Sequence, residues 1–205
     1  MAATRTDGSA ASPRGLAEAR ADEAALVAET GGGDSRAFRV LMDRHLVSIV
    51  SVARRMLRDD AEAEDVAQEA FLRLWRSSAT LEIGAAGIRP WLRRVVSNLC
   101  LDRVRSLGRV KVVEELPEVP EPPKQLAALE SQDTQRRVEA AMQKLPDRQR
   151  LALTLFHFEG LSQIEIGQAM GISDEAVESL LSRARRQLKA DLRTDWESLR
   201  NDGEL

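Results

Sequence analysis

Cysteine, histidine and aromatic residues are scarce in this chain of 205 residues. It has one cysteine, two histidines and no tyrosine, and aromatic residues make up 3% of it. A single cysteine, Cys100, excludes a disulfide within the chain and fits a reducing cytoplasm. Because His45 and His157 are far apart in sequence, a zinc site or a Cys/His nucleophile pair is not expected. We therefore predict no metal, no cofactor and no enzymatic activity.

Long apolar runs are absent as well. No stretch approaches the roughly 18 apolar residues of a membrane span, and the first residues lack the apolar core of a secretion signal. The paired acids Asp59 and Asp60 fall in an expected helix break, without the apolar surroundings that a general acid needs. These absences favour a cytoplasmic protein with no membrane insertion and no small-molecule substrate.

Strong helix formers are abundant, since alanine, leucine, arginine and glutamate dominate the composition. We therefore predict an all-α protein. Helical periodicity runs from about residue 22 to 75, with breaks at 31–34 and 58–60. It resumes over residues 91–107 and again over 134–196, where the apolar residues again recur at helical spacing.

An acidic, proline-rich stretch precedes the last helical part. Residues 112–124 contain four prolines, which remove backbone donors, together with glutamates that repel one another. This composition predicts a flexible linker between two small helical domains. The predicted boundaries are an unstructured extension at 1–21, a first domain at 22–108, the linker at 109–133, a second domain at 134–196 and a tail at 197–205.

The charge is segregated along the chain, although the net charge is only −3. Residues 89–111 hold seven lysines and arginines against one acid, and residues 183–193 hold five against one acid. Local basic stripes of this kind attract phosphates whatever the sign of the total charge. The sequence therefore predicts two separate contacts with nucleic acid.

Residues 161–188 carry a helix-turn-helix pattern. Ser162 and Glu165 form a capping box that starts a helix, and Gly171 ends it. Ser173 caps the next helix, and Gly167 is small enough for the two helices to cross closely. Two helices joined by a short turn with glycine are typical of DNA-binding domains, although an ordinary helical hairpin remains the alternative.

The second helix of this pattern is amphipathic. The predicted core face holds Val177, Leu180, Leu181, Ala184 and Leu188. The opposite face holds Glu175, Ser179, Ser182 and Arg186, with Glu178 and Arg183 on its flanks. Hydroxyl and guanidinium groups can reach base edges and phosphates in a major groove, whereas the alternative is a surface helix with solvated charges.

Residues 61–76 form a second amphipathic helix. Its predicted core half holds Val66, Ala67, Ala70, Phe71, Leu74 and Trp75, and its outer half holds Asp65, Gln68, Glu69, Leu72, Arg73 and Arg76. Leu72 is an apolar residue surrounded by charge, which is typical of a partner surface. A stray surface leucine is the alternative.

A third amphipathic helix covers residues 89–106. Its predicted buried side holds Leu92, Val95, Val96 and Leu99, and its other side holds Trp91, Arg94, Asn98, Leu101 and Arg105. Arginine and asparagine on one face suit unstacked single-stranded DNA, whereas the alternative is a solvated arginine-rich face. We expect Cys100 to be a core thiol and His157 to be a packed residue.

Three segments resemble the extracytoplasmic function (ECF) sigma factors of bacterial RNA polymerase, in the order of that family. KLPDRQRLALTLFHFEGLSQIEIGQAMGISDEAVESLLSRARRQL resembles region 4, AEDVAQEAFLRLW resembles region 2.2, and RPWLRRVVSNLCLDRVRS resembles region 2.4. The resemblance implies a sigma factor of two helical domains that carries core RNA polymerase to promoter DNA, with an anti-sigma factor as a regulatory partner.

The resemblance also implies site residues. Polymerase contacts are Asp65, Gln68, Glu69 and Leu72; contacts with the −10 element are Arg73, Ser77, Trp91, Arg94 and Asn98; contacts with the −35 element are Ser179, Ser182 and Arg183, to which the helical wheel adds Arg186. The sequence departs from the family at Glu178 and Leu180, which are commonly basic, and in the loop over residues 81–88.

Two other functions are weighed against a sigma factor. A helix-turn-helix regulator of the two-component type would need a receiver domain with alternating strands and helices, and the N-terminal half shows no such alternation. A sigma-like decoy, which binds an anti-sigma factor and not DNA, stays open because of Glu178 and Leu180.

Overall fold

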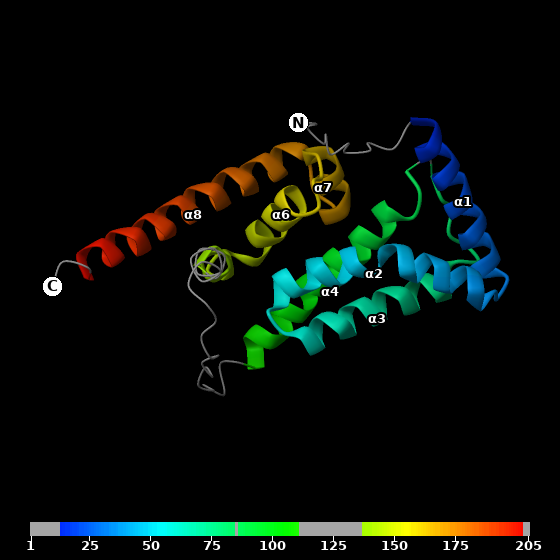
Figure 1. Cartoon of the computed structure of the whole chain (residues 1–205), viewed down its shortest axis with the longest axis horizontal. Coiled ribbons are helices and arrows are strands. Elements are labelled where there is room, and N and C mark those ends of the chain that lie inside the picture. Colours follow the sequence, from blue (N-terminus) through cyan, green and yellow to red (C-terminus); the bar gives the residue numbers. More distant parts are fainter. Residues whose placement is uncertain (1–12, 85, 111–136, 203–205) are drawn as a thin grey trace, which may run out of the picture. The chain divides into compact units, whose positions relative to one another are not determined.

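The computed structural model describes residues 13–84, 86–110 and 137–202, with side chains described over 22–84, 86–107 and 137–193. These ranges contain helices and no strands (Figure 1). The labelled helices are α1 (Pro13–Gly31), α2 (Ser35–Leu57), α3 (Asp60–Ser77), α4 (Arg89–Val110), α6 (Asp147–His157), α7 (Gln163–Met170) and α8 (Asp174–Asp202). The all-α prediction is confirmed. The predicted linker lies almost wholly outside the described residues.

The first helix starts earlier than the sequence pattern indicates. α1 begins at Pro13, so residues 13–21, expected to be unstructured, are helical. Proline is favoured in the first turn of a helix, and the alanine, arginine and glutamate that follow are strong helix formers. These residues lack a clear apolar period, which is why periodicity alone missed them.

Local hydrogen bonds fix the two predicted breaks between the first three helices. Oδ1 of Asp34 accepts from the backbone N–H of Arg36 at 2.7 Å, which caps α2. Oδ1 of Asp59 accepts from the backbone N–H of Glu62 at 3.0 Å, which caps α3. Aspartate is among the best residues at such positions because its oxygen satisfies an otherwise unpaired donor. Gly31 ends α1, and a Cβ there would lie 2.8 Å from Cα of Ala79.

The described chain falls into two compact units. The first unit comprises residues 13–45 and 71–89. Leu41, Leu74 and Ile88 are fully buried in it. Trp75 was expected in this core but is 37% exposed, and its ring meets Phe38 edge-on with the centroids 5.1 Å apart. Trp75 lies near the end of α3, which is Ser77.

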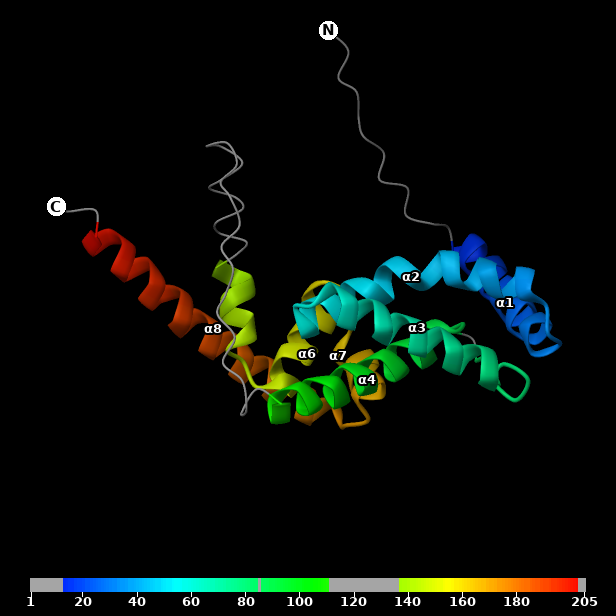
Figure 2. The same ribbon diagram turned by 90° about the horizontal axis from the view of Figure 1, so that it is seen from below.

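The second unit comprises residues 46–70 and the described residues from 90 onward. Within it the end of α2, the start of α3 and α4 lie side by side, as Figures 1 and 2 show. α6 and α7 pack against α8, and residues 137–143 form a further helical segment before α6. The division into units cuts through α2 and α3, so the domain boundary placed in the linker stays a prediction.

The buried face of α4 is rotated from the predicted one. Leu101, expected on the outer side, is 8% exposed, whereas Val95 and Leu99 are only half-buried. Ser97 and Cys100 are completely buried. The core thiol predicted for Cys100 is confirmed, and burial raises its pKa to about 12. A thiol of that kind stays protonated and unreactive at neutral pH.

Candidate nucleic-acid and polymerase interfaces

The helix-turn-helix begins with the predicted capping box. Ser162 Oγ accepts from the backbone N–H of Glu165 at 3.3 Å, and Glu165 Oε2 accepts from the backbone N–H of Ser162 at 2.9 Å. These bonds satisfy two donors that the first turn of α7 would leave unpaired. They also stabilise the carboxylate, so the pKa of Glu165 lies below its ordinary value, chiefly because the Ser162 backbone donates to it.

The turn between α7 and α8 depends on two glycines. Gly171 ends α7 in the left-handed conformation, at φ 64°. At Gly167, a Cβ would lie 2.8 Å from the carbonyl oxygen of Ile172 and 3.1 Å from Oδ1 of Asp174. Ser173 then caps α8, because its Oγ accepts from the backbone N–H of Ala176 at 3.4 Å. The turn therefore brings the start of α8 against α7 through backbone contact.

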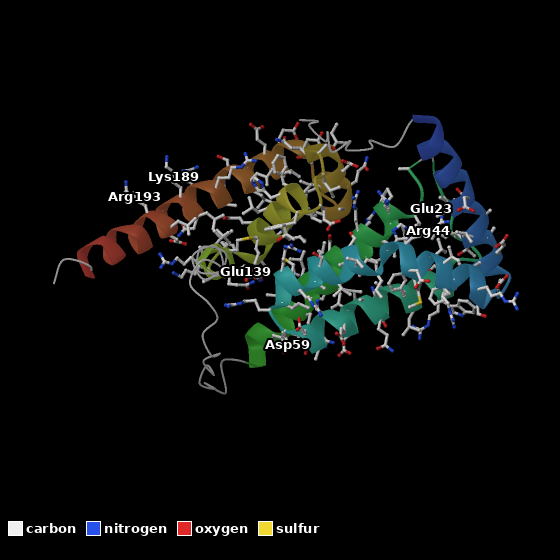
Figure 3. The ribbon with its side chains drawn as sticks, viewed as in Figure 1. Glu23, Arg44, Asp59, Glu139, Lys189 and Arg193 are labelled. Carbon is white, nitrogen blue, oxygen red and sulfur yellow. The ribbon has the colours of Figure 1, made fainter. Side chains whose placement is uncertain are left out.

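The outward face of α8 is exposed as predicted. Val177, Leu181 and Ala184 are buried against α6 and α7, and Leu180 and Leu188 are half-buried. Among the predicted −35 contacts, Ser182, Arg183 and Arg186 are exposed and Ser179 is half-buried. Glu178 is also exposed, so it adds an acid to this surface. Further along α8, Lys189 and Arg193 project from the helix and extend its basic side (Figure 3).

The outward face of α3 exposes an apolar residue among charges. Leu72 is 40% exposed, whereas Phe71 and Leu74 on the opposite face are buried. Asp65 and Gln68 are exposed and Glu69 is half-buried. The structure thus places all four predicted polymerase contacts on a single helix, and three of them are well exposed.

The predicted −10 contacts come from two helices. On α3, Arg73 is exposed and Ser77 is half-buried. On α4, Arg94 and Asn98 are exposed and Trp91 is half-buried. Asn98 is one turn after Arg94, so their side chains leave α4 on the same side. The guanidinium and the amide can therefore meet neighbouring parts of one strand.

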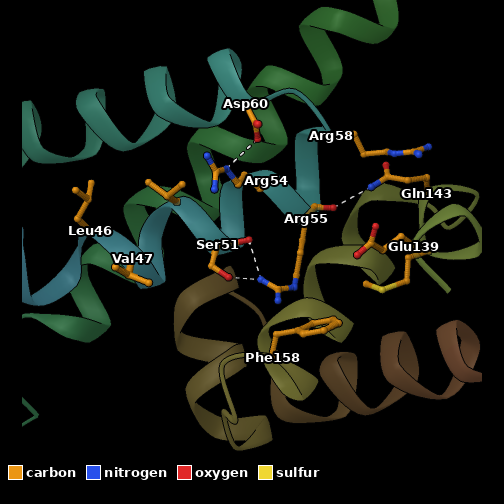
Figure 4. A pocket seen from close by; sticks show the side chains of 12 residues that line it. Leu46, Val47, Ser51, Arg54, Arg55, Arg58, Asp60, Glu139, Gln143 and Phe158 are labelled. Carbon is orange, nitrogen blue, oxygen red and sulfur yellow. Dashed lines mark hydrogen bonds and ion pairs between the residues drawn. The ribbon is translucent and has the colours of Figure 1, made fainter. Parts of the chain in front are cut away.

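A cavity of about 710 Å³ lies in the second unit, between the end of α2 and residues 139–158 (Figure 4). The guanidinium of Arg55 lies over the ring of Phe158, 4.0 Å from its centroid, and Gln143 Nε2 donates to the carbonyl oxygen of Arg55 at 2.9 Å. The described lining includes neither histidine nor cysteine.

The described residues offer neither a cluster of metal ligands nor a membrane-spanning helix. Within them, no group of three or more His, Cys, Asp or Glu side chains could hold a metal ion. No helix in the same part of the chain is both long and apolar enough to cross a bilayer.

His157, expected to be packed, is exposed and meets the ring of Phe156 edge-on at 5.1 Å.

The two sets of helices match two regions of known proteins. Residues 41–110 match the family model of sigma-70 region 2, and residues 135–188 match that of sigma-70 region 4. The ECF RNA polymerase sigma factor SigW of Bacillus subtilis is 31% identical over 175 residues, which cover 78% of this chain and 91% of that protein. The chain belongs to the ECF sigma factors.

Two further comparisons describe how far the similarity extends. The ECF RNA polymerase sigma factor SigE of Mycolicibacterium smegmatis is 35% identical over 154 residues, which cover 73% of this sigma factor. The match spans 59% of that relative's length. Among solved structures, CnrH in complex with the cytosolic domain of CnrY is similar with a TM-score of 0.62 and 27% identity. That comparison covers 85% of this sigma factor and 99% of the other chain.

Two arginine contacts on the helices of the predicted interfaces could not be read from the sequence pattern. Arg185, one of the five basic residues over 183–193, stacks over Phe156 of α6 at 4.9 Å. Arg103 of α4 pairs with Glu62 and, at 3.5 Å, with Asp65 of α3. The second arginine lies 38 to 41 positions from its partners, so no local pattern could reveal it. It fixes Asp65, one of the predicted polymerase contacts, against α4.

Proposed function

We propose that this sigma factor binds core RNA polymerase through the outward face of α3 and recognises promoters with α4 and α8. In this division, α4 captures the melted −10 strand and α8 reads the duplex −35 element. Tethering both helices to one polymerase raises the effective concentration of each weak DNA contact. The protein acts where the polymerase acts, in the cytoplasm.

One observation carries the proposal: a capped helix-turn-helix presents hydroxyl and guanidinium groups on the exposed side of α8. Ser182, Arg183 and Arg186 lie on that side, and the turn that positions them is held by close backbone contact. A helix presented in this way can enter the major groove, where arginine recognises guanine by two hydrogen bonds.

A regulatory partner is part of the proposal. We infer that an anti-sigma factor covers the polymerase and DNA surfaces of this chain until transcription is required. CnrH, which shares the fold, forms a complex with the cytosolic domain of CnrY. The exposed Leu72 supports the inference, since apolar residues among charges favour protein partners.

Transcription in vitro with purified core polymerase tests the proposed function. The reaction uses a library of duplex templates that are randomised over the two promoter elements. We expect transcripts from a subset of templates that share a −10 and a −35 sequence, and none from core polymerase alone. A chain that binds core polymerase but yields no selective transcripts would refute promoter recognition.

A decoy that binds an anti-sigma factor and not DNA is a second candidate, favoured by one observation. Glu178 is exposed on the side of α8 that would face DNA, where its carboxylate would repel phosphate. The same transcription reaction separates the two functions, because a decoy gives no transcripts. If the chain is a sigma factor, Glu178→Lys is expected to raise its non-specific affinity for DNA.

The two exposed arginines of α8 are expected to differ in their roles. Arg183→Ala should reduce discrimination between −35 sequences by about 1–3 kcal/mol, because a base-reading pair is lost. Arg186→Ala should weaken binding of all sequences alike. It should also lower the slope of log affinity against log salt concentration by about one, because one phosphate contact is lost. Binding of the polymerase complex to randomised duplexes at two salt concentrations measures both. Equal effects of the two variants on sequence preference would contradict this assignment.

A further inference from the structure

A buried carboxylate joins three distant segments in the first unit. Glu23 on α1 is 8% exposed and His45 on α2 is 5% exposed. Glu23 Oε1 lies 3.0 Å from Nε2 of His45. The second oxygen, Oε2, accepts from the backbone N–H of Ile88 at 3.2 Å. Glu23 therefore uses both oxygens to tie α1 and α2 to the residue that immediately precedes α4 (Figure 3 labels Glu23).

The protonation state of His45 fits this arrangement. Burial lowers the pKa of His45, and Arg89 and Arg44 lower it further, while Glu23 acts in the opposite direction. The imidazole is therefore neutral at neutral pH and donates from Nε2 to the Glu23 carboxylate. A buried carboxylate is tolerated where hydrogen bonds replace its lost hydration, and here two donors do so.

The segment held by Glu23 leads directly into the predicted −10 helix. Two hydrogen bonds in and before this segment join near neighbours: Ser78 Oγ donates to the Trp75 carbonyl at 2.8 Å, and the Gly87 N–H donates to the Gly84 carbonyl at 3.0 Å. Gly87 has a positive φ of 73°, so the chain turns sharply just before Ile88. The bond from Ile88 to Glu23, 65 positions away, therefore anchors the end of this turn to the rest of the unit.

We propose that Glu23 is a positioning residue for −10 recognition, which acts with His45 to fix the backbone at Ile88 and thereby the loop that precedes α4. Glu23 does not touch DNA in this proposal. It fixes Ile88, the residue directly before the start of α4, which is the helix that carries Trp91 and Asn98. The proposal rests on the proposed function of α4.

The test uses the full chain bound to core polymerase and three variants. Glu23→Met keeps the length of the side chain and removes both acceptors. Glu23→Gln keeps one oxygen for the Ile88 N–H. Asp22→Ala is the matched control, because Asp22 is the neighbouring acid and its ion pair with Arg44 is exposed to solvent. The probe is the strand that the wild-type complex selects from a pool of DNA single strands randomised over ten positions.

We expect Glu23→Met to weaken binding of the selected strand by about tenfold, because the buried Ile88 N–H loses its acceptor. Glu23→Gln should keep most of the affinity and Asp22→Ala all of it. Affinity for duplex −35 DNA and for core polymerase should not change in any variant. Full single-strand affinity in a folded Glu23→Met variant would overturn the positioning role.

Two further results keep the test decisive. If circular dichroism shows that Glu23→Met does not fold, amide hydrogen exchange of Ile88 in the wild-type chain takes the place of the binding measurement with that variant. Rapid exchange of the Ile88 amide would overturn the proposal. Slow exchange that persists in Glu23→Gln supports it. If the wild-type complex selects no single strand, then −10 recognition itself fails. If instead the wild-type complex selects a strand and Glu23→Met binds that strand equally well, only the positioning role of Glu23 fails.

Discussion

Replacing Asn98 with alanine is expected to impair promoter opening while binding of duplex −35 DNA stays intact. Asn98 is exposed on α4, so its loss removes an amide that can bond to a base edge without disturbing the core. A hydrogen-bonded base contact contributes about 1–3 kcal/mol, which corresponds to a loss of affinity for the −10 single strand of roughly fivefold to 150-fold. Single-strand binding and transcription from a duplex promoter are the measurements.

A matched change on the same helix serves as the control. Asp102 is also exposed on α4, and its ion pair with Arg105, at 3.5 Å, is a surface contact that contributes little to stability. Asp102→Ala should therefore leave transcription unchanged. If Asn98→Ala transcribed as well as Asp102→Ala from a duplex promoter, Asn98 would have no part in the −10 contact.

Introducing a charge at Leu72 is expected to weaken binding of the chain to core polymerase. Leu72 is 40% exposed at the centre of a charged helix face, so Leu72→Asp should leave the fold intact. A hot-spot residue at the centre of an interface contributes about 2 kcal/mol or more; we expect Leu72 to be one, so that affinity for core polymerase falls at least about thirtyfold. Circular dichroism and titration against core polymerase measure the two effects separately.

Leu74 provides the contrast to Leu72 on the same helix. Leu74 is fully buried, and Leu74→Asp would place a charge in the core, so that variant should unfold and lose polymerase binding for that reason alone. A folded Leu72→Asp variant that bound core polymerase with wild-type affinity would show that this face of α3 is not the contact.

Local features of the fold could be predicted from the sequence, because their causes lie within a few residues. The capping box of Ser162 and Glu165 and the glycine stop at Gly171 are both present as predicted. The exposure of Leu72 follows from the spacing of apolar residues along α3 in the same way. Each of these depends on backbone groups or neighbours one turn away.

Features that depend on distant segments could not be predicted in this way. The wheel placed Leu101 on the outer side of α4, but the true buried face is set by helices from elsewhere in the chain. Glu23 contacts His45, which is 22 positions away, and Ile88, which is 65 positions away. No pattern in the neighbouring sequence predicts either contact. The contacts assigned by the family resemblance, such as that of Asn98 with the −10 strand, remain predictions.

Outward positions of α8 can vary, whereas the close crossing of α7 and α8 at Gly167 fixes the residue at that position. Any side chain there would push against the carbonyl of Ile172, and so would shift the whole of α8 relative to its support. Ser182 and Arg183 meet no such constraint, since their side chains are exposed, and Ser179 is half-buried. New promoter preferences could therefore be engineered, or could evolve, by exchanging a few outward residues on an unaltered scaffold. A library confined to those positions should yield many folded proteins with different DNA preferences.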